Sequence, residues 1–129
     1  MGFKFPLQAL LKKNKYEEEL AKKEFAEAQA ILNKTLQKIA QHEEDIVNAR
    51  EQMSSMQVAG GQVLGGLDYR TNYIDGLKTK ISNLQEIARE QMTFVEEKKQ
   101  AMIRARQEYK KIEVLRDKSL KEYKHLQKK

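Results

Sequence analysis

A single proline, Pro6, occurs in this chain of 129 residues. Proline ends or kinks a helix, because it lacks the backbone N–H donor and its ring clashes with the preceding turn. A chain almost without proline can form long uninterrupted helices, and loop-rich or sheet-rich folds are disfavoured. The chain also has no cysteine. This excludes disulfide scaffolds, thiolate metal sites and cysteine nucleophiles.

Four glycines, Gly60, Gly61, Gly65 and Gly66, cluster in the stretch VAGGQVLGG. Each glycine inside a helix costs about 1 kcal/mol relative to alanine, so the cluster should break a helix. The flanking sequences are rich in Ala, Leu, Lys, Glu and Gln, which are strong helix formers. We therefore predict a single domain, 1–129, with one helix over about 6–58, a glycine-rich turn over 59–66 and a second helix over about 66–128.

Ladder residues, spaced alternately three and four positions apart, run through both halves of the chain. The first ladder comprises Ala21, Phe25, Ala28, Leu32, Thr35, Ile39, His42, Ile46, Ala49, Met53 and Met56. The second, with more polar interruptions, comprises Leu67, Arg70, Ile74, Leu77, Ile81, Leu84, Ala88, Gln91, Val95, Lys98, Met102, Ala105, Tyr109, Ile112, Arg116, Ser119, Tyr123 and Leu126. Repeats of this length are typical of coiled coils. The fold class predicted is all-α, a long antiparallel two-helix coiled-coil hairpin.

Two further features concern the predicted second helix. Apolar or small residues stand one position before several ladder sites, at Ile87, Phe94, Ala101 and Leu115. We therefore expect the apolar face to drift around the helix, as it does in a straight helix of 3.6 residues per turn. Gly76 lies inside the same helix and marks a weak point.

Positive charge is concentrated near the C-terminus. Residues 98–129 carry 12 basic and 4 acidic side chains, a net charge of +8, whereas residues 1–97 carry 13 basic and 15 acidic ones. The sequence has no stretch approaching the roughly 18–20 uncharged apolar residues of a membrane-spanning helix. The opening MGFKFPLQALLKK lacks the small-residue cleavage site of a secretory signal, so we expect none.

The sequence shows no pattern typical of catalysis or metal binding. Its two histidines, His42 and His125, are far apart and lack an HExxH context. Acidic residues follow His42, but zinc prefers at least three protein ligands, so we interpret His42 as a polar ladder residue that helps to fix register. The glycine-rich stretch lacks the Lys-Ser/Thr ending of a phosphate loop. We expect no enzymatic activity and no catalytic, cofactor-binding or metal-binding residues.

The two ends of the chain resemble those of one known family. FliJ proteins tend to open with a Phe-x-Phe-x-Leu-Gln-x-Leu-Leu pattern, matched here by Phe3, Phe5, Leu7, Gln8, Leu10 and Leu11. The closing EYKKIEVLRDKSLKEYKHLQKK is similar to the last helix of that family. FliJ is the soluble component of the bacterial flagellar type III export apparatus, and the resemblance covers nearly the whole chain.

The resemblance implies an antiparallel coiled coil similar to the central stalk subunit of rotary ATPases. It places the protein on the cytoplasmic side of the cell membrane, in flagellum assembly, motility and chemotaxis. The end with both termini would enter the hexameric export ATPase, the opposite end would face the cytoplasmic domain of the membrane export gate, and escort of export chaperones is a further implied role. No cofactor and no nucleic acid is implied.

Residues of suitable type occur at both ends. For the ATPase end they are Phe3, Phe5, Leu7, Lys110, Lys111, Arg116, Lys118, Lys121 and Lys124. For the tip facing the export gate they are Met53, Met56, Leu67, Tyr69, Tyr73 and Leu77. The Met and Tyr residues either close the end of the core or form an exposed, adaptable patch for a partner.

Other interpretations remain open. A pI near 9.4 suits a nucleic-acid binder, although here Lys and Arg alternate with Glu around the helix. The segment 3–11 could lie on a membrane surface, but it is short for stable anchoring. A generic structural coiled coil could form parallel dimers, which would have to tolerate four glycines in mid-helix.

Overall fold

The computed structural model describes residues 2–58 and 64–128, with side chains over 2–56 and 68–128. Two helices account for nearly all of this part of the chain. Helix α1 spans Gln8–Val58 and helix α2 spans Leu64–Gln127, and the residues described include no strand. The helices pack against each other, which confirms the predicted all-α helical hairpin.

The helix ends follow the distribution of proline and glycine. Pro6 and Leu7 form a turn before α1, in which the Gln8 N–H donates to the Phe5 carbonyl at 3.0 Å. Helix α2 begins at Leu64, so Gly65 and Gly66 lie in its first turn, where N–H groups have no intrahelical acceptor in any case. Of the predicted turn, residues 59–63 lie outside the described part of the chain.

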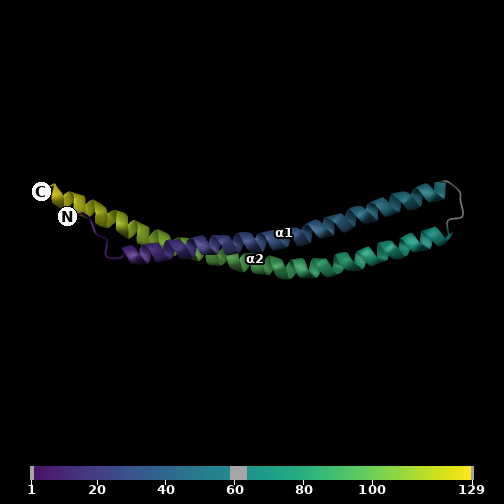
Figure 1. Cartoon of the computed structure of the whole chain (residues 1–129), viewed down its shortest axis with the longest axis horizontal. Helices are drawn as coiled ribbons and strands as arrows, with labels where there is room; N and C mark the ends of the chain where they lie inside the picture. Colours follow the sequence, from purple (N-terminus) through teal and green to yellow (C-terminus); the bar gives the residue numbers. More distant parts are fainter. Residues whose placement is uncertain (1, 59–63, 129) are drawn as a thin grey trace. The chain divides into compact units, whose positions relative to one another are not determined.

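Packing divides the chain into two compact units, each built from one stretch of α1 and one of α2. Unit 1 comprises Met1–Gln29 and Phe94–Lys129, and unit 2 comprises Ala30–Thr93. Figure 1 shows both termini in unit 1, in purple and yellow, and the facing ends of α1 and α2 in unit 2. Each unit is described by itself below.

The core of unit 2 consists of ladder residues from both helices. Ile46 and Ala49 of α1 pack with Ile74 and Leu77 of α2, and the partly buried Met53 and Ile81 extend this cluster. Burying a side chain such as Leu or Ile contributes about 1.5–3 kcal/mol. All described ladder residues of unit 2 are buried or half-buried. The predicted ladders therefore hold unit 2 together.

Polar ladder residues of unit 2 are accommodated in different ways. The Thr35 hydroxyl donates to the Ile31 carbonyl at 3.4 Å, within its own helix. The Arg70 Nε donates to the Met56 sulfur at 3.2 Å, and its Nη1 donates to the Gln52 side-chain oxygen. By contrast, His42 Nδ1 and Gln91 Oε1 are enclosed without a hydrogen-bond partner among the residues described. A buried polar atom without a hydrogen-bond partner lowers the stability of the fold by about 1–3 kcal/mol.

The ladder residues through which α1 and α2 contact each other form a seam, and this seam is more polar in unit 1 than in unit 2. On α1 the ladder spacing continues back from Ala21 to Leu11, Asn14 and Glu18, and all three of these residues are buried. On α2 the ladder residues are only half-buried, and Arg116 and Leu126 are exposed. None of the described residues 94–128 is fully buried. The C-terminal half of α2 is thus covered only in part.

Contacts between the helices give the same antiparallel register in each unit. In unit 1, Lys98 Nζ lies 3.1 Å from Glu24 Oε2, and the Phe3 and Tyr123 rings are 5.5 Å apart. The residue numbers of these pairs sum to 122 and 126, as do those of the two contacts of Arg70 in unit 2, with Gln52 and Met56. The spacing of the ladders and the central glycines predicts pairs that sum to about 125.

The predicted drift of the apolar face along α2 was wrong. Ile87, Phe94 and Leu115, one position before ladder sites, are 45–47% exposed, and Ala101 is half-buried. The described ladder residues up to Tyr123 remain buried or half-buried, except for the exposed Arg116. A drift of about 20° per heptad applies to an unpartnered straight helix. Here packing against α1 keeps one face of α2 turned inwards at most of its ladder positions.

Gly76 provides a test of helix propensity in unit 2. The helix passes through this exposed residue without a break, and nothing lies within 4 Å of the position that a Cβ would occupy. We therefore expect Gly76→Ala to raise the free energy of unfolding by about 0.5–1 kcal/mol in urea titrations followed by circular dichroism. The converse change at an exposed α1 position, Ala40→Gly, should lower it by a similar amount. A destabilising Gly76→Ala would contradict this account of the helix.

Candidate docking surfaces

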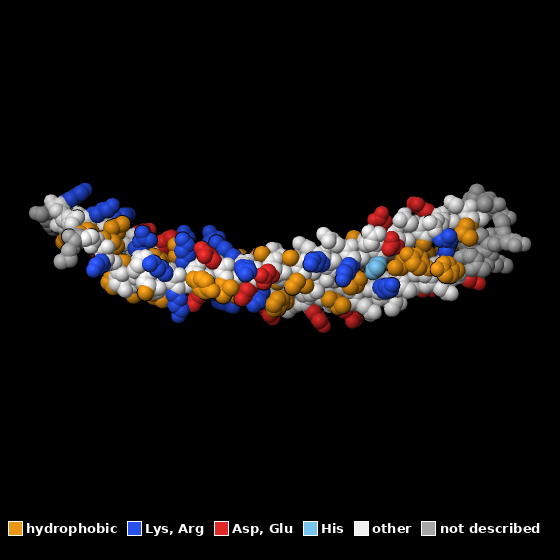
Figure 2. Space-filling model, in the orientation of Figure 1, with side chains coloured by type: hydrophobic (Ala, Val, Ile, Leu, Met, Phe, Trp, Pro, Cys, Tyr) orange, Lys and Arg blue, Asp and Glu red, His pale blue; other side chains and the backbone are white. Residues whose placement is uncertain are grey.

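All nine residues predicted for the ATPase end lie in unit 1. Phe3 and Phe5 are half-buried, Leu7 is exposed, and the six cations on α2 are exposed. The tilted contact of Phe3 with Tyr123 holds the N-terminal segment against the last turns of α2. Figure 2 shows Lys and Arg side chains gathered over this unit. The structure thus brings together residues from the two ends of the sequence.

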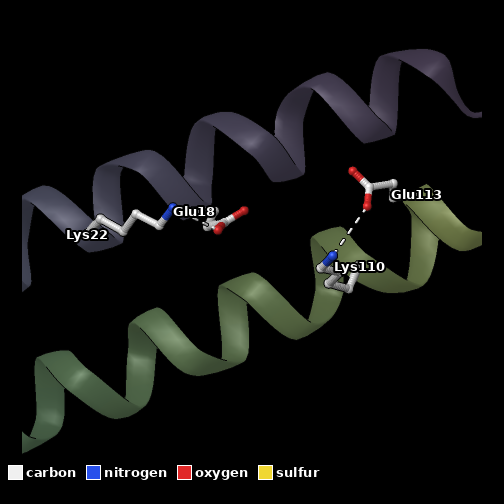
Figure 3. A network of polar contacts seen from close by, with 4 residues as sticks. All are labelled: Glu18, Lys22, Lys110 and Glu113. Atoms are coloured by element: carbon white, nitrogen blue, oxygen red, sulfur yellow. Dashed lines mark ion pairs between the residues drawn. The ribbon is translucent and has the colours of Figure 1, made fainter.

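Carboxylates on both helices of unit 1 are paired with lysines, some at the seam and some on the exposed face of α2. Glu18 on α1 is buried and lies 3.1 Å from Lys22 Nζ. On α2, Lys110 Nζ lies 3.5 Å from Glu113 Oε1, and Lys111 Nζ lies 3.1 Å from Glu108 Oε1. Figure 3 shows Glu18 and Glu113 extending into the space between the two helices. The lysines of this region therefore already have acidic neighbours within the chain.

Tyr109 occupies a ladder position beside these carboxylates. Its pKa is raised above the ordinary value of 10.0, chiefly by a hydrogen bond to Glu113, then by desolvation and by the negative charges of Glu113 and Glu18. Arg116 acts weakly in the opposite direction. The neutral phenol is the form that fits between two carboxylates, because it donates a proton that a phenolate would lack.

The outer face of α2 carries an open depression of about 990 Å³. Its apolar lining comes from Ile103, Val114 and Leu115, and its basic lining from Arg106, Lys110 and Lys111. Val114 is 62% exposed, although valine is an apolar residue. We call this surface the outer groove. Sequence reasoning identified two of its lysines but missed Ile103, Arg106 and Val114.

The signal for the outer groove was present in the sequence. Ile103, Gln107, Lys110 and Val114 are spaced four, three and four residues apart, so they share one helix face. The polar Gln107 and the cation Lys110 stand between the two aliphatic side chains and hide the stripe in a hydropathy pattern. Asn14 and Glu18 hide the N-terminal extension of the α1 ladder in the same way.

The residues predicted for the tip differ in exposure. Tyr69 is 74% exposed and Tyr73 46%, while Met53 and Met56 are half-buried. Leu77 is only 4% exposed and belongs to the core of unit 2, so it is not available at the surface. The side chain of Leu67 lies outside the described part of the structure. Among the predicted tip residues whose side chains the structure describes, the two tyrosines are therefore the exposed ones.

The described residues include no group of three or more His, Cys, Asp or Glu side chains placed to hold a metal ion. No helix there combines the length and apolar character needed to cross a membrane.

Comparison with models of known protein families gives a match over nearly the whole chain. The family model described as flagellar FliJ protein matches residues 3–129, which is almost the whole chain. Comparison of this chain with the curated proteins and with the solved structures found no match.

The raised pKa of Tyr109 makes the stability of unit 1 depend on pH. A group whose pKa is higher in the folded state stabilises the fold below its unfolded pKa of about 10, and this contribution is lost as the pH rises through the folded value. We therefore expect the stability of the wild type to fall more steeply above pH 10 than that of Tyr109→Phe, in thermal melts followed by circular dichroism. Tyr16→Phe, at an exposed residue of the same unit, should behave like the wild type. If the stability of Tyr109→Phe and of the wild type changed with pH in the same way, Tyr109 would not be the source of this pH dependence.

Proposed function

Because this chain belongs to the FliJ family of flagellar proteins, matched over residues 3–129, we propose that it is a non-enzymatic coiled-coil component of flagellar type III protein export. Unit 1 docks into the hexameric export ATPase. The exposed tyrosines of unit 2 contact the cytoplasmic domain of the membrane export gate. The protein acts at the cytoplasmic face of the membrane and escorts export chaperones.

The observation that carries this proposal is the incomplete cover of α2 in unit 1. From residue 94 to residue 128 no described residue is fully buried, whereas α2 in unit 2 buries Ile74, Leu77 and Ala88. Most helix stability in proteins comes from packing of an apolar face rather than from propensity. A helix that is covered so little would gain stability from a partner that encloses it, as the interior of an ATPase ring would.

The charge of the same segment favours an acidic partner. Residues 98–129 carry a net charge of +8, and the lysines and arginines named for the ATPase end are exposed. Clustered charge of one sign steers association and raises its rate more than it raises affinity. A ring lined with acidic side chains would attract unit 1 over a distance of about a Debye length, roughly 10 Å at 0.1 M salt.

The tip proposal rests on the exposure of Tyr69 and Tyr73. Tyrosine is enriched at protein interfaces, since it offers a large apolar surface with a polar end. Both residues lie on α2 within unit 2, the unit without the chain termini. Two partners can thus be held through different residues of one chain.

A charge-reversal experiment tests the ATPase contact. We expect Lys110, Lys111, Lys118 and Lys121 changed together to Glu to weaken binding to purified export ATPase by about tenfold to a hundredfold at low salt. The loss should shrink as salt is added, because exposed charges are screened. The matched control changes four exposed lysines of unit 2, Lys34, Lys38, Lys78 and Lys80, to Glu, and should bind nearly as the wild type does.

Two results would contradict electrostatic docking. In one, reversal in unit 1 leaves ATPase binding unchanged at low salt. In the other, both sets of four substitutions weaken binding equally, which would mean that only the net charge of the chain matters. Circular dichroism of each variant would establish that helix content is retained.

The tip contact has its own test. Tyr69→Ala with Tyr73→Ala should lower binding to the cytoplasmic domain of the export gate by about tenfold or more, with little dependence on salt. ATPase binding should remain as in the wild type. Tyr16→Ala, at an exposed tyrosine of unit 1, is the matched control and should leave gate binding intact. Normal gate binding by the double variant would exclude this surface.

A further inference from the structure

The outer groove lies on the side of α2 turned away from α1. Met102, Tyr109 and Ile112 are half-buried on the ladder face, whereas Lys110 and Val114 are exposed one or two positions further on. Each position turns the helix by about 100°, which separates the two faces. From Ile103 to Leu115 the groove covers roughly 18 Å of helix, or about three turns.

The side chains of the groove follow an amphipathic order. Ile103 lies at one end and Val114 with Leu115 at the other, while Arg106, Lys110 and Lys111 lie between them. Val114 and Leu115 are 62% and 45% exposed. Apolar side chains of this exposure next to cations fit a partner that presents apolar and acidic side chains in alternation.

We propose that the outer groove docks an amphipathic helix of a protein partner, with an apolar stripe that contacts Ile103, Val114 and Leu115 and with Glu or Asp beside it that contact Arg106, Lys110 and Lys111. A docked helix presents anchors at positions i, i+4, i+7 and i+11, a stripe of roughly 16 Å that matches the rise along α2 from Ile103 to Val114. Carboxylates of the docked helix would replace Glu113 and Glu108 as the ion-pair partners of Lys110 and Lys111. These intrachain pairs are exposed or partly exposed, and pairs of that kind contribute little.

The groove suits a helix better than a nucleic acid or a membrane. Its apolar residues are aliphatic and offer no aromatic surface on which bases could stack. Glu108 and Glu113 lie within 3.5 Å of the lysines and would repel a phosphate backbone. Three aliphatic side chains also bury too little area for stable insertion into a lipid surface.

This inference rests on the proposed function only in assigning protein docking to unit 1. The proposed ATPase contact needs the charge and incomplete cover of α2, whereas the groove requires in addition the specific apolar residues Ile103, Val114 and Leu115. A test with a synthetic helix contains no ATPase, so either proposal can fail without the other.

The test uses three synthetic peptides of about 18 residues titrated into the full chain. One carries Leu in an i, i+4, i+7, i+11 stripe flanked by Glu, the second replaces each Glu by Lys, and the third scrambles the order of the first. Only the first should bind. Val114→Ser should weaken its binding roughly tenfold, as expected for loss of a buried valine. Val47→Ser, at an exposed valine of unit 2, should not.

The charge contribution has a matched pair of variants as well. Arg106→Glu should weaken binding of the acidic peptide several-fold and allow the basic peptide to bind, whereas Arg50→Glu, at an exposed arginine of unit 2, should do neither. Both arginines are exposed helix residues, and circular dichroism checks that both variants remain folded.

Three results would overturn the proposal. Equal binding of the ordered and scrambled peptides, or equal loss with Val114→Ser and Val47→Ser, would mean that charge attracts the peptide without a groove. No binding of the acidic peptide would exclude this occupant. Val114-dependent binding of anionic phosphatidylserine vesicles or of an oligonucleotide, in place of the peptide, would assign the face to that ligand.

Discussion

The packing of α1 against α2 along one ladder of side chains is the interaction on which the fold depends, because an amphipathic helix cannot bury its own apolar stripe. Ile46, Ala49, Ile74 and Leu77 leave water only because the other helix covers them. The antiparallel register follows from the same contacts. Pairs such as Glu24 with Lys98 then form at its margins, where they stabilise the fold by about 1 kcal/mol or less.

The two units use this seam to different extents. Unit 2 contains the apolar cluster. Its stability is reduced by the polar atoms of His42 and Gln91, which are enclosed without a hydrogen-bond partner among the described residues. Unit 1 places Asn14 and Glu18 at buried ladder positions, opposite a stretch of α2 that has no fully buried residue. A buried polar residue in a coiled coil lowers stability while it fixes register. Unit 1 is therefore the unit in which cover by another protein would add most to stability.

The sequence predicted the helices and most of the seam because both depend on local pattern. Pro6 and the glycine cluster marked the helix ends, and ladder residues from Ala21 to Met56 are all buried or half-buried. Pattern failed where a polar side chain took an apolar position, as at Glu18, and where the partner helix overrode the drift expected for α2. Leu77 looked like a surface anchor at the tip, but only the fold shows that Ile46 and Ala49 cover it.

A two-helix fold leaves each helix with a face that takes no part in holding it together. On α2 of unit 1 this face carries Val114 and Leu115 between cations, while Tyr109 and Ile112 face the seam. Substitutions on the outer face can therefore change what the protein binds while the ladder keeps its register. Independence of recognition and folding fails where the two faces share a partner: Lys110 and Tyr109 both contact Glu113, so substitutions at these two residues should show coupled effects.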